Sequence, residues 1–260
     1  MKKDLDLTSY EKLVLEEYIA SLPECEREKA KENALARLSE GEPIAYIVKK
    51  QYFYDMHFYV TPDTLIPRPD TEHVVDLAIR KIKKNGRFAD LCTGSGCIAL
   101  TILNSRKDLV STAVDISEKA LDVAKHNAEY WSLGDRICFE KLDILSDAPP
   151  SGLFDAIISN PPYIKGSVVD EYPSLSYEPR IALDAGEDDM IFYKTIIEKY
   201  RNSLSPDAFF LFEIGYDQGE KIKTLALESG YACEVYKDFS HNDRVAYLTP
   251  IGEDKKEIIT

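Results

Sequence analysis

The sequence has few of the residues from which metal sites and disulfide frameworks are built. Its 260 residues include five cysteines, an odd number, and only four histidines, and no two cysteines form a Cys-x-x-Cys pair. Neither a zinc site nor a disulfide framework is indicated, and we expect no metal ion. Such cysteine usage is typical of a reduced compartment, so the sequence predicts a cytoplasmic protein. Cys92, Cys97 and Cys138 fall on or beside predicted strands and are interpreted as small core residues.

Two further absences concern membranes and nucleic acids. No apolar run approaches the length of a membrane span, and residues 1–6 lack the apolar core of a secretion signal. Basic residues form no cluster larger than pairs such as Lys49-Lys50, and the formal net charge is −14. The chain therefore lacks the basic footprint that is usual for binding long nucleic acids. A protein or a small molecule is the favoured partner, and no direct contact with nucleic acid or membrane is expected.

Composition and periodicity divide the chain into a large domain and a small appendage. With 44% hydrophobic and 30% charged residues, the chain can bury a sizeable core. Residues 1–42 are predicted to form an N-terminal helical domain of two amphipathic helices, the second beginning near Pro23. Residues 43–72 are predicted to form a β-hairpin and a linker, because aromatic and β-branched side chains, Tyr46 and Ile47 among them, gather there.

Residues 73–260 show alternating strand and helix patterns. Such alternation predicts an α/β fold in which helices cover both faces of a parallel, Rossmann-like sheet. The last two predicted strands are separated by a short polar loop at 239–243, which is too short for a crossover helix, so the last strand should be antiparallel. Seven strands are predicted, near residues 87–91, 110–114, 137–142, 155–159, 209–214, 231–236 and 244–249.

A turn with two glycines follows the first strand of this sheet. Gly94 and Gly96 allow close backbone approach, and the helix start that follows offers free N–H groups and a partial positive charge. Such a turn holds a carboxylate or a phosphate. Because it lacks both the third glycine of a dinucleotide turn and the Lys-Ser/Thr ending of a phosphate-binding loop, the carboxylate of a methionine moiety fits better. The candidate cofactor residues here are Asp90, Cys92, Thr93, Gly94, Ser95 and Gly96.

Two aspartates stand at the ends of the next two strands. Asp115 lies nineteen residues after Gly96, where a carboxylate can accept two hydrogen bonds from a ribose diol. Asp143 can accept a hydrogen bond from the exocyclic amine of adenine, while Ile144 packs on the ring. Each aspartate alone could equally be a solvated strand end or a helix cap. Signals at the ends of three successive strands together indicate S-adenosylmethionine as the cofactor.

The most informative stretch is Asn160-Pro161-Pro162-Tyr163, which follows a short apolar run typical of a buried parallel strand. It is expected where open α/β sheets bind ligands, just past the carboxyl end of a strand. The prolines stiffen the turn, and the Asn160 side-chain oxygen and Pro161 carbonyl can each accept one hydrogen of a planar NH2 group. Tyr163 offers a flat face to that group. The alternative is a strand-ending turn with a buried tyrosine.

These motifs together resemble the glutamine-specific protein methyltransferases that modify peptide chain release factors, the family once called HemK. The matching motifs extend over roughly residues 41–250, and their combination is far more specific than any single one. It implies a seven-stranded methyltransferase sheet with an N-terminal helical domain, joined by a hairpin. The motifs that carry it are Gly41 to Tyr46, Leu65 to Glu72, Asp90 to Leu100, Asp115 to Ser117, Ser159 to Ile164, Tyr177 to Pro179, Ala182-Leu183, Glu213 to Gly215 and Asn242 to Val245.

The resemblance implies methyl transfer from S-adenosylmethionine to the side-chain amide nitrogen of the glutamine in a Gly-Gly-Gln motif. The implied catalytic residues are Asn160 and Pro161, which would hold the amide hydrogens, and Tyr163, which would hold the amide plane. Asn160 is also a candidate contact of the cofactor. The loop 65–72 and the segment 177–183 are expected to close over the ligands. Arg68 is expected to pair with a carboxylate and Glu72 to meet the methionine amine. The implied substrate-binding residues are Asn160, Pro161, Pro162, Tyr163, Arg68 and Glu178.

Three departures from the family pattern are visible. Only about two helices precede Gly41, where the family has more, Cys92 stands where glycine is common, and Ile144 stands where a larger residue sometimes packs on adenine.

Three other functions stay open. The same chemistry on a ribosomal-protein glutamine is the nearest alternative. An adenine or guanine amino-methyltransferase also fits Asn160 but not the missing basic groove, and a non-catalytic cofactor-binding protein fits the intact motifs poorly. We expect a monomer that acts on peptide chain release factors.

Overall fold

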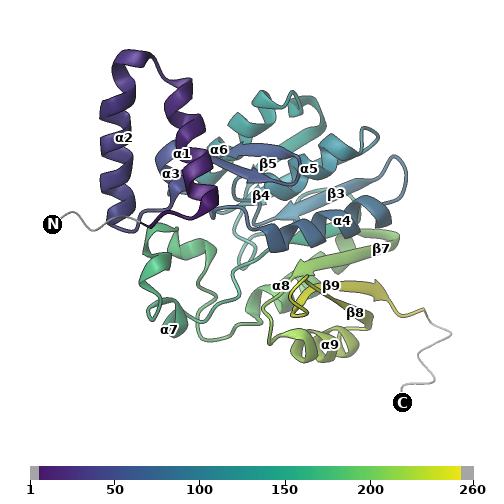
Figure 1. The fold of residues 1–260 in the computed structure, drawn as a ribbon. Helices are drawn as coiled ribbons and strands as arrows, with labels where there is room; N and C mark the ends of the chain where they lie inside the picture. Colours follow the sequence, from purple (N-terminus) through teal and green to yellow (C-terminus); the bar gives the residue numbers. More distant parts are fainter. Residues whose placement is uncertain (1–5, 253–260) are drawn as a thin grey trace.

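A seven-stranded sheet organises the C-terminal two thirds of the protein (Figure 1). The structure is a computed structural model, and it describes residues 6–252. The strand order is β5-β4-β3-β6-β7-β9-β8, in which β9 is antiparallel to both of its neighbours and the other pairs are parallel. The strands are β3 (Arg87–Leu91), β4 (Val110–Asp115), β5 (Ile137–Lys141), β6 (Phe154–Ser159), β7 (Leu204–Glu213), β8 (Tyr231–Lys237) and β9 (Asp243–Pro250). The predicted fold class, including the antiparallel last strand, is confirmed.

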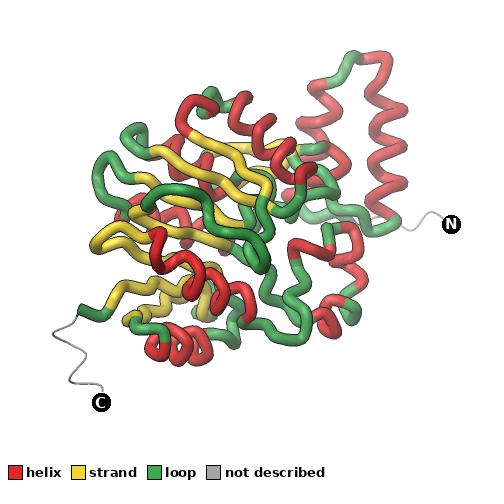
Figure 2. Tube along the Cα trace, turned by 180° about the vertical axis from the view of Figure 1, so that it is seen from behind, coloured by secondary structure: helices red, strands yellow, loops and turns green. Residues whose placement is uncertain are grey.

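Helices cover both faces of this sheet, as Figure 2 shows from behind. Successive strand residues point to opposite faces, so Phe88 joins one buried cluster and Ala89 the other. The first cluster packs against α4 (Glu72–Lys81), α5 (Cys97–Ser105) and α6 (Glu118–Tyr130), and the second against α8 (Ile191–Tyr200) and α9 (Gly219–Glu228). Strands buried on both sides explain why the sequence shows them as short continuous apolar runs.

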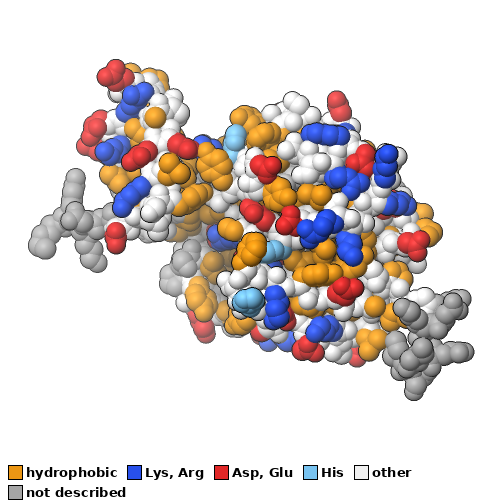
Figure 3. Space-filling model, turned by 45° about the vertical axis from the view of Figure 1, so that its right-hand side comes forward, with side chains coloured by type: hydrophobic (Ala, Val, Ile, Leu, Met, Phe, Trp, Pro, Cys, Tyr) orange, Lys and Arg blue, Asp and Glu red, His pale blue; other side chains and the backbone are white. Residues whose placement is uncertain are grey.

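The first two helices form a lobe that projects from the sheet domain, with Lys/Arg and Asp/Glu side chains interspersed on it (Figure 3). They are α1 (Ser9–Ser21) and α2 (Glu24–Ser39). Thr8 caps α1, accepting a hydrogen bond from the Glu11 backbone, while the Glu11 carboxylate accepts from the Thr8 N–H. A small buried cluster joins the two helices to α3 (Ile44–Val48). No helix within residues 6–252 combines the length and apolar character needed to cross a membrane.

The hairpin is shorter than the sequence suggested. The structure has β1 (Lys50–Phe53) and β2 (Met56–Tyr59), but Tyr46 and Ile47, predicted as part of the hairpin, lie in α3. The prediction was wrong there because all of Ile44 to Ile47 are buried, so no period distinguishes helix from strand. Cys138 was also wrongly expected in the core: it is exposed on β5, an edge strand of the sheet.

Candidate active site

A cavity of about 270 Å³ lies at the carboxyl ends of β3, β4, β5 and β6. This volume is close to the lower end of the range for small-molecule sites, about 300–1,000 Å³. Parallel strands bring their carboxyl ends to one edge, so side chains far apart in sequence meet there. The lining includes Cys92, Thr93, Gly94, Ser95, Asp115, Asp143, Ile144, Asn160, Pro162 and Arg68, all of which the sequence singled out.

The glycine turn between β3 and α5 forms one wall of this cavity. Gly96 has φ +80° at the start of α5, and a Cβ there would lie 3.0 Å from Leu100 Cδ1 and 3.3 Å from Ala124 Cβ, so only glycine fits without displacement. Cys92 also has a positive φ, 60°, a backbone conformation that glycine adopts more readily than other residues. The Gly94 N–H donates to Asp115 Oδ2 at 2.9 Å. This bond joins the turn to the end of β4.

Asp90 lies beneath the turn and is not among the residues that line the cavity. Its Oδ2 accepts hydrogen bonds from Thr93 Oγ1 at 2.6 Å and from the Ala99 N–H at 3.3 Å, while Oδ1 has no partner within residues 6–252. Complete burial raises the pKa of Asp90 to about 7, against the hydrogen bonds from Thr93 and Ala99, which lower it. The structure therefore places Asp90 as a support of the turn.

A pH-dependent stability follows from Asp90. Between its ordinary pKa of 3.8 and about 7, the folded protein retains a proton that the unfolded chain has lost, so the free energy of unfolding falls as the pH rises through this window. We expect the unfolding free energy of the wild type, relative to that of Asp90→Asn, to decrease by a few kcal/mol between pH 4 and pH 8. Urea denaturation of both proteins across this range is the measurement. A pH-independent difference contradicts the assignment.

Asp115 and Asp143 occupy the ends of β4 and β5. Asp115 Oδ1 accepts from the Ser117 N–H at 2.9 Å, and burial raises the pKa of this carboxyl against the backbone hydrogen bonds that lower it. Each Asp115 oxygen keeps a further acceptor position. Asp143 accepts from the Leu145 N–H and the Ser146 hydroxyl, at 2.9 and 3.0 Å, so part of its capacity holds its own turn. Both carboxylates and buried Ile144 line the same cavity.

Asn160 lies where this cavity meets a second one, of about 170 Å³. The two cavities share four lining residues, which are Leu65, Arg68, Asn160 and Ala182. Tyr163 lines only the second cavity and Pro162 only the first, while buried Pro161 lines neither. Asn160, directly after β6, is therefore in contact with both spaces.

A carboxylate that the sequence analysis left without a role forms part of the second cavity. Glu213 ends β7 and is buried, and its Oε2 accepts a hydrogen bond from Thr71 Oγ1 at 2.5 Å. Its Oε1 accepts from the Tyr163 hydroxyl at 3.3 Å. Burial raises the pKa of Glu213, and hydrogen bonds from Thr71 and Tyr163 with the charge of Arg244 oppose that effect. The strand-end rule that singled out Asp115 could also have found Glu213.

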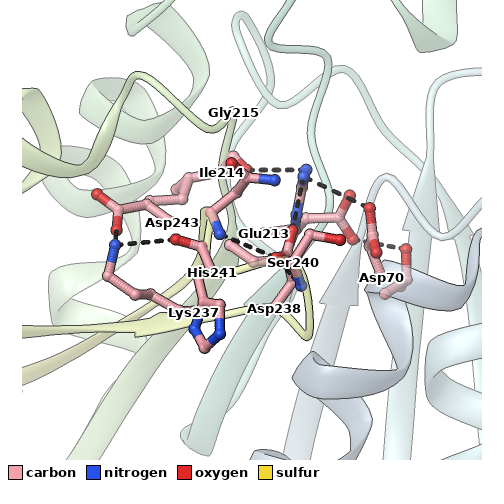
Figure 4. Close-up of polar contacts among 12 residues, drawn as sticks. Asp70, Glu213, Ile214, Gly215, Lys237, Asp238, Ser240, His241 and Asp243 are labelled. Atoms are coloured by element: carbon pink, nitrogen blue, oxygen red, sulfur yellow. Dashed lines mark hydrogen bonds and ion pairs between the residues drawn. The ribbon is translucent and has the colours of Figure 1, made fainter.

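Arg244, on β9, brings a positive charge to the carboxylates beside the second cavity. Its Nη2 lies 3.4 Å from Asp70 Oδ2 and 3.3 Å from Asp238 Oδ2, and only 12% of its side chain is exposed. Figure 4 shows Asp70, Glu213 and Asp238 converging from the segment before α4, the end of β7 and the turn between β8 and β9. The Arg244 guanidinium balances the charge of buried Asp238 and acts on buried Glu213 through its charge, while Asp70 is half exposed.

Two residues of the expected ligand-closing loop make contacts within the protein. Arg68 forms an ion pair with buried Glu178, whose Oε2 also accepts from the Ile66 N–H at 3.1 Å, so the pair ties the loop 65–72 to the segment 177–183. Glu72 accepts from the Tyr54 N–H at 2.7 Å, on the hairpin, and is not among the residues lining either cavity. The structure does not bring Glu72 to the proposed methionine site. Within residues 6–252 no cluster of three His, Cys, Asp or Glu side chains has the arrangement of a metal site.

Comparisons with known proteins agree with this geometry. The family model described as the methyltransferase small domain matches residues 73–173. A release factor glutamine methyltransferase of Neisseria gonorrhoeae is 38% identical over 229 residues, which cover 86% of this chain and 82% of that protein. Another, of Salmonella typhimurium, is 39% identical and covers 81% of this chain and 76% of that protein.

Solved structures share the fold. The ribosomal protein L11 methylase of Lactobacillus delbrueckii subsp. bulgaricus aligns with a TM-score of 0.53 over 74% of this chain and 84% of that one. At 21% sequence identity, this likeness supports the arrangement of the sheet and its helices and nothing finer.

The sheet order, the glycine turn and the strand-end cavity define an S-adenosylmethionine-dependent methyltransferase. Identity of 38–39% over most of both chains narrows the assignment, and the chain belongs to the release factor glutamine methyltransferase family. The resemblance predicted from the sequence motifs is confirmed.

Proposed function

We propose that this protein transfers a methyl group from S-adenosylmethionine to the side-chain amide nitrogen of the glutamine in the Gly-Gly-Gln motif of a peptide chain release factor. The family of the chain supports the reaction. The observation that carries the proposal is the place of Asn160, which faces both the cavity of the glycine turn and the second cavity beside it. A donor in the first cavity and an acceptor amide in the second would meet at this residue.

The first cavity fits the cofactor by the chemistry of its lining. Gly94 and Gly96 let the backbone of the turn approach a carboxylate closely, and Asp115 has acceptor positions for a ribose diol. Asp143 and Ile144 provide an acceptor and an apolar surface for adenine. When bound, S-adenosylmethionine supplies a methyl group activated by a positively charged sulfonium.

The second cavity is the proposed acceptor site. An amide nitrogen is a poor nucleophile because its lone pair is delocalised into the carbonyl. Asn160 Oδ1 accepts one amide hydrogen in this cavity, which orients the nitrogen and increases its electron density. Pro161 lines neither cavity, so the second amide hydrogen bond, to its carbonyl, stays a prediction from the sequence. As the new N–C bond forms and the S–C bond of the donor breaks, one amide hydrogen leaves as a proton. Tyr163 lines this cavity and limits the tilt of the amide plane. Arg68 also lines this cavity, and its ion pair with Glu178 holds the two covering segments together. Glu178 itself lines neither cavity and Pro162 lines only the first, so their direct contact with the substrate stays a prediction from the sequence.

We also propose a domain division, an oligomeric state and a location for the protein. Residues 1–42 form the substrate-recognition domain, residues 43–72 the hairpin and linker, and residues 73–260 the methyltransferase domain; residues 1–5 and 253–260 lie outside the described part. We propose that the protein acts as a monomer in the cytoplasm and makes no direct contact with nucleic acid. The formal net charge of −14 supports the last point.

Labelled methyl transfer tests the proposed function. The protein is incubated with S-adenosylmethionine carrying a labelled methyl group and with a purified release factor, its Gln→Ala variant at the Gly-Gly-Gln motif, ribosomes or DNA. We expect label in the release factor and none in the Gln→Ala variant. Label in a ribosomal protein or in DNA instead would falsify the proposed substrate and favour one of the two catalytic alternatives.

A further inference from the structure

The orientation of the Asn160 side chain decides whether it can serve the proposed reaction. An asparagine amide turned by 180° exchanges its oxygen acceptor for an NH2 donor, at almost unchanged shape. Only the oxygen can accept a hydrogen from the substrate amide. A residue that fixes this choice therefore controls the reaction without touching the substrate.

Thr71 is placed to fix the orientation of the Asn160 side-chain amide. Asn160 Nδ2 donates to Thr71 Oγ1 at 3.5 Å, and Thr71 Oγ1 donates to Glu213 Oε2 at 2.5 Å. Thr71 and Glu213 are each 2% exposed, so water competes little for either group. The three side chains come from separate segments: Thr71 ends the short 3-10 helix before α4, Asn160 directly follows β6, and Glu213 ends β7.

The chemistry of the three groups gives the two linked hydrogen bonds, from Asn160 to Thr71 and from Thr71 to Glu213, a single direction. An ionised carboxylate only accepts, so the one hydroxyl hydrogen of Thr71 is directed to Glu213. Thr71 Oγ1 can then only accept a hydrogen bond from Asn160, and the donor on Asn160 is its Nδ2. Asn160 Oδ1 is consequently on the other side of the amide. Burial raises the pKa of Glu213, while the hydrogen bonds from Thr71 and Tyr163 and the charge of Arg244 favour its ionised form.

We propose that Thr71 and Glu213 are positioning residues, which hold Asn160 with its side-chain oxygen toward the substrate amide. This inference rests on the proposed function and extends it from the residues that touch the substrate to those that orient them. Thr71 also lines the first cavity and Glu213 the second, so a role in orienting Asn160 must be separated from direct contact with either ligand. If the two residues act through Asn160, their loss lowers the rate of transfer and leaves the affinity for the cofactor nearly unchanged.

Three variants and one control test the inference. Thr71→Val removes the hydroxyl at similar volume, Thr71→Ser keeps it, and Glu213→Gln keeps the size of the side chain but adds a donor that can reverse the chain. Thr101→Val is the matched control, because Thr101 is also buried but its hydroxyl has no partner in the described structure. For each protein, kcat and KM for the release factor are measured, with calorimetric affinity for S-adenosylmethionine.

We expect Thr71→Val and Glu213→Gln to lower kcat roughly tenfold, the effect of one misdirected hydrogen bond. The affinity for S-adenosylmethionine should stay within about twofold of the wild type in both, which also shows that the variants fold. Thr71→Ser and Thr101→Val should retain nearly the wild-type kcat. Wild-type kcat in Thr71→Val, or a Thr71→Ser variant as slow as Thr71→Val, overturns the inference. A wild-type protein that leaves the release factor unlabelled instead overturns the proposed function.

Discussion

Replacing Asn160 with alanine is expected to lower methyl transfer to the release factor by about 10²–10³-fold, the cost of losing a preorganised polar contact to the reacting group. Asn160 lies between the two cavities and holds the amide whose nitrogen must face the methyl donor. Its removal leaves the glycine turn, Asp115 and Asp143 in place. The affinity for S-adenosylmethionine should therefore change little.

Single-turnover transfer of labelled methyl, with calorimetric binding of the cofactor, separates these two effects. Asn202→Ala is the matched control, because Asn202 is an exposed asparagine after α8 and lines neither cavity. We expect it to behave as the wild type. Unchanged turnover in Asn160→Ala removes Asn160 from the mechanism, and a parallel loss of cofactor affinity shifts its role to the cofactor side.

The second large effect is expected on cofactor binding, where Asp115→Ala should weaken the affinity for S-adenosylmethionine by roughly 30–100-fold. A carboxylate that accepts hydrogen bonds from a diol contributes about 1.5–3 kcal/mol. The substitution also frees the Gly94 N–H, which donates to Asp115 Oδ2, and so loosens the turn that holds the methionine end.

Calorimetry with the purified protein measures this change directly. Asp135→Ala removes an exposed carboxylate that lines neither cavity and should bind the cofactor as the wild type does. An Asp115→Ala affinity equal to that of the wild type refutes the ribose role. A variant that also loses thermal stability without the cofactor shows that the link to Gly94 is the larger part of the effect.

The sheet was predictable because its signal is local. Buried parallel strands appear as apolar runs, and the short loop before residue 243 could only join antiparallel strands. Much of the cofactor cavity was predictable for the same reason. Once the strand ends are known, topology places Asp115 and Asn160 at one edge without any knowledge of side-chain packing.

Contacts between distant segments were not predictable in this way. Thr71 and Glu213 are 142 residues apart, and nothing in either local sequence indicates that their side chains meet. Glu72 had several plausible partners, and the hairpin amide of Tyr54 is the one it reaches. The short helix at Ile44–Val48 was missed because its burial comes from the neighbouring helices, which override local strand propensity.

The place of β9 in the sheet has a consequence for biosynthesis. β8 pairs only with β9 in the described sheet, and β7 pairs with β9 on the side away from β6. The last strand also brings Arg244, the cation that lies close to Asp70 and Asp238 and whose charge acts on Glu213. A growing chain on the ribosome therefore keeps an open edge on β7, and Asp70 and Asp238 lack the cation of Arg244, until β9 has been synthesised. The proposed acceptor site is complete only once β9 has joined the sheet.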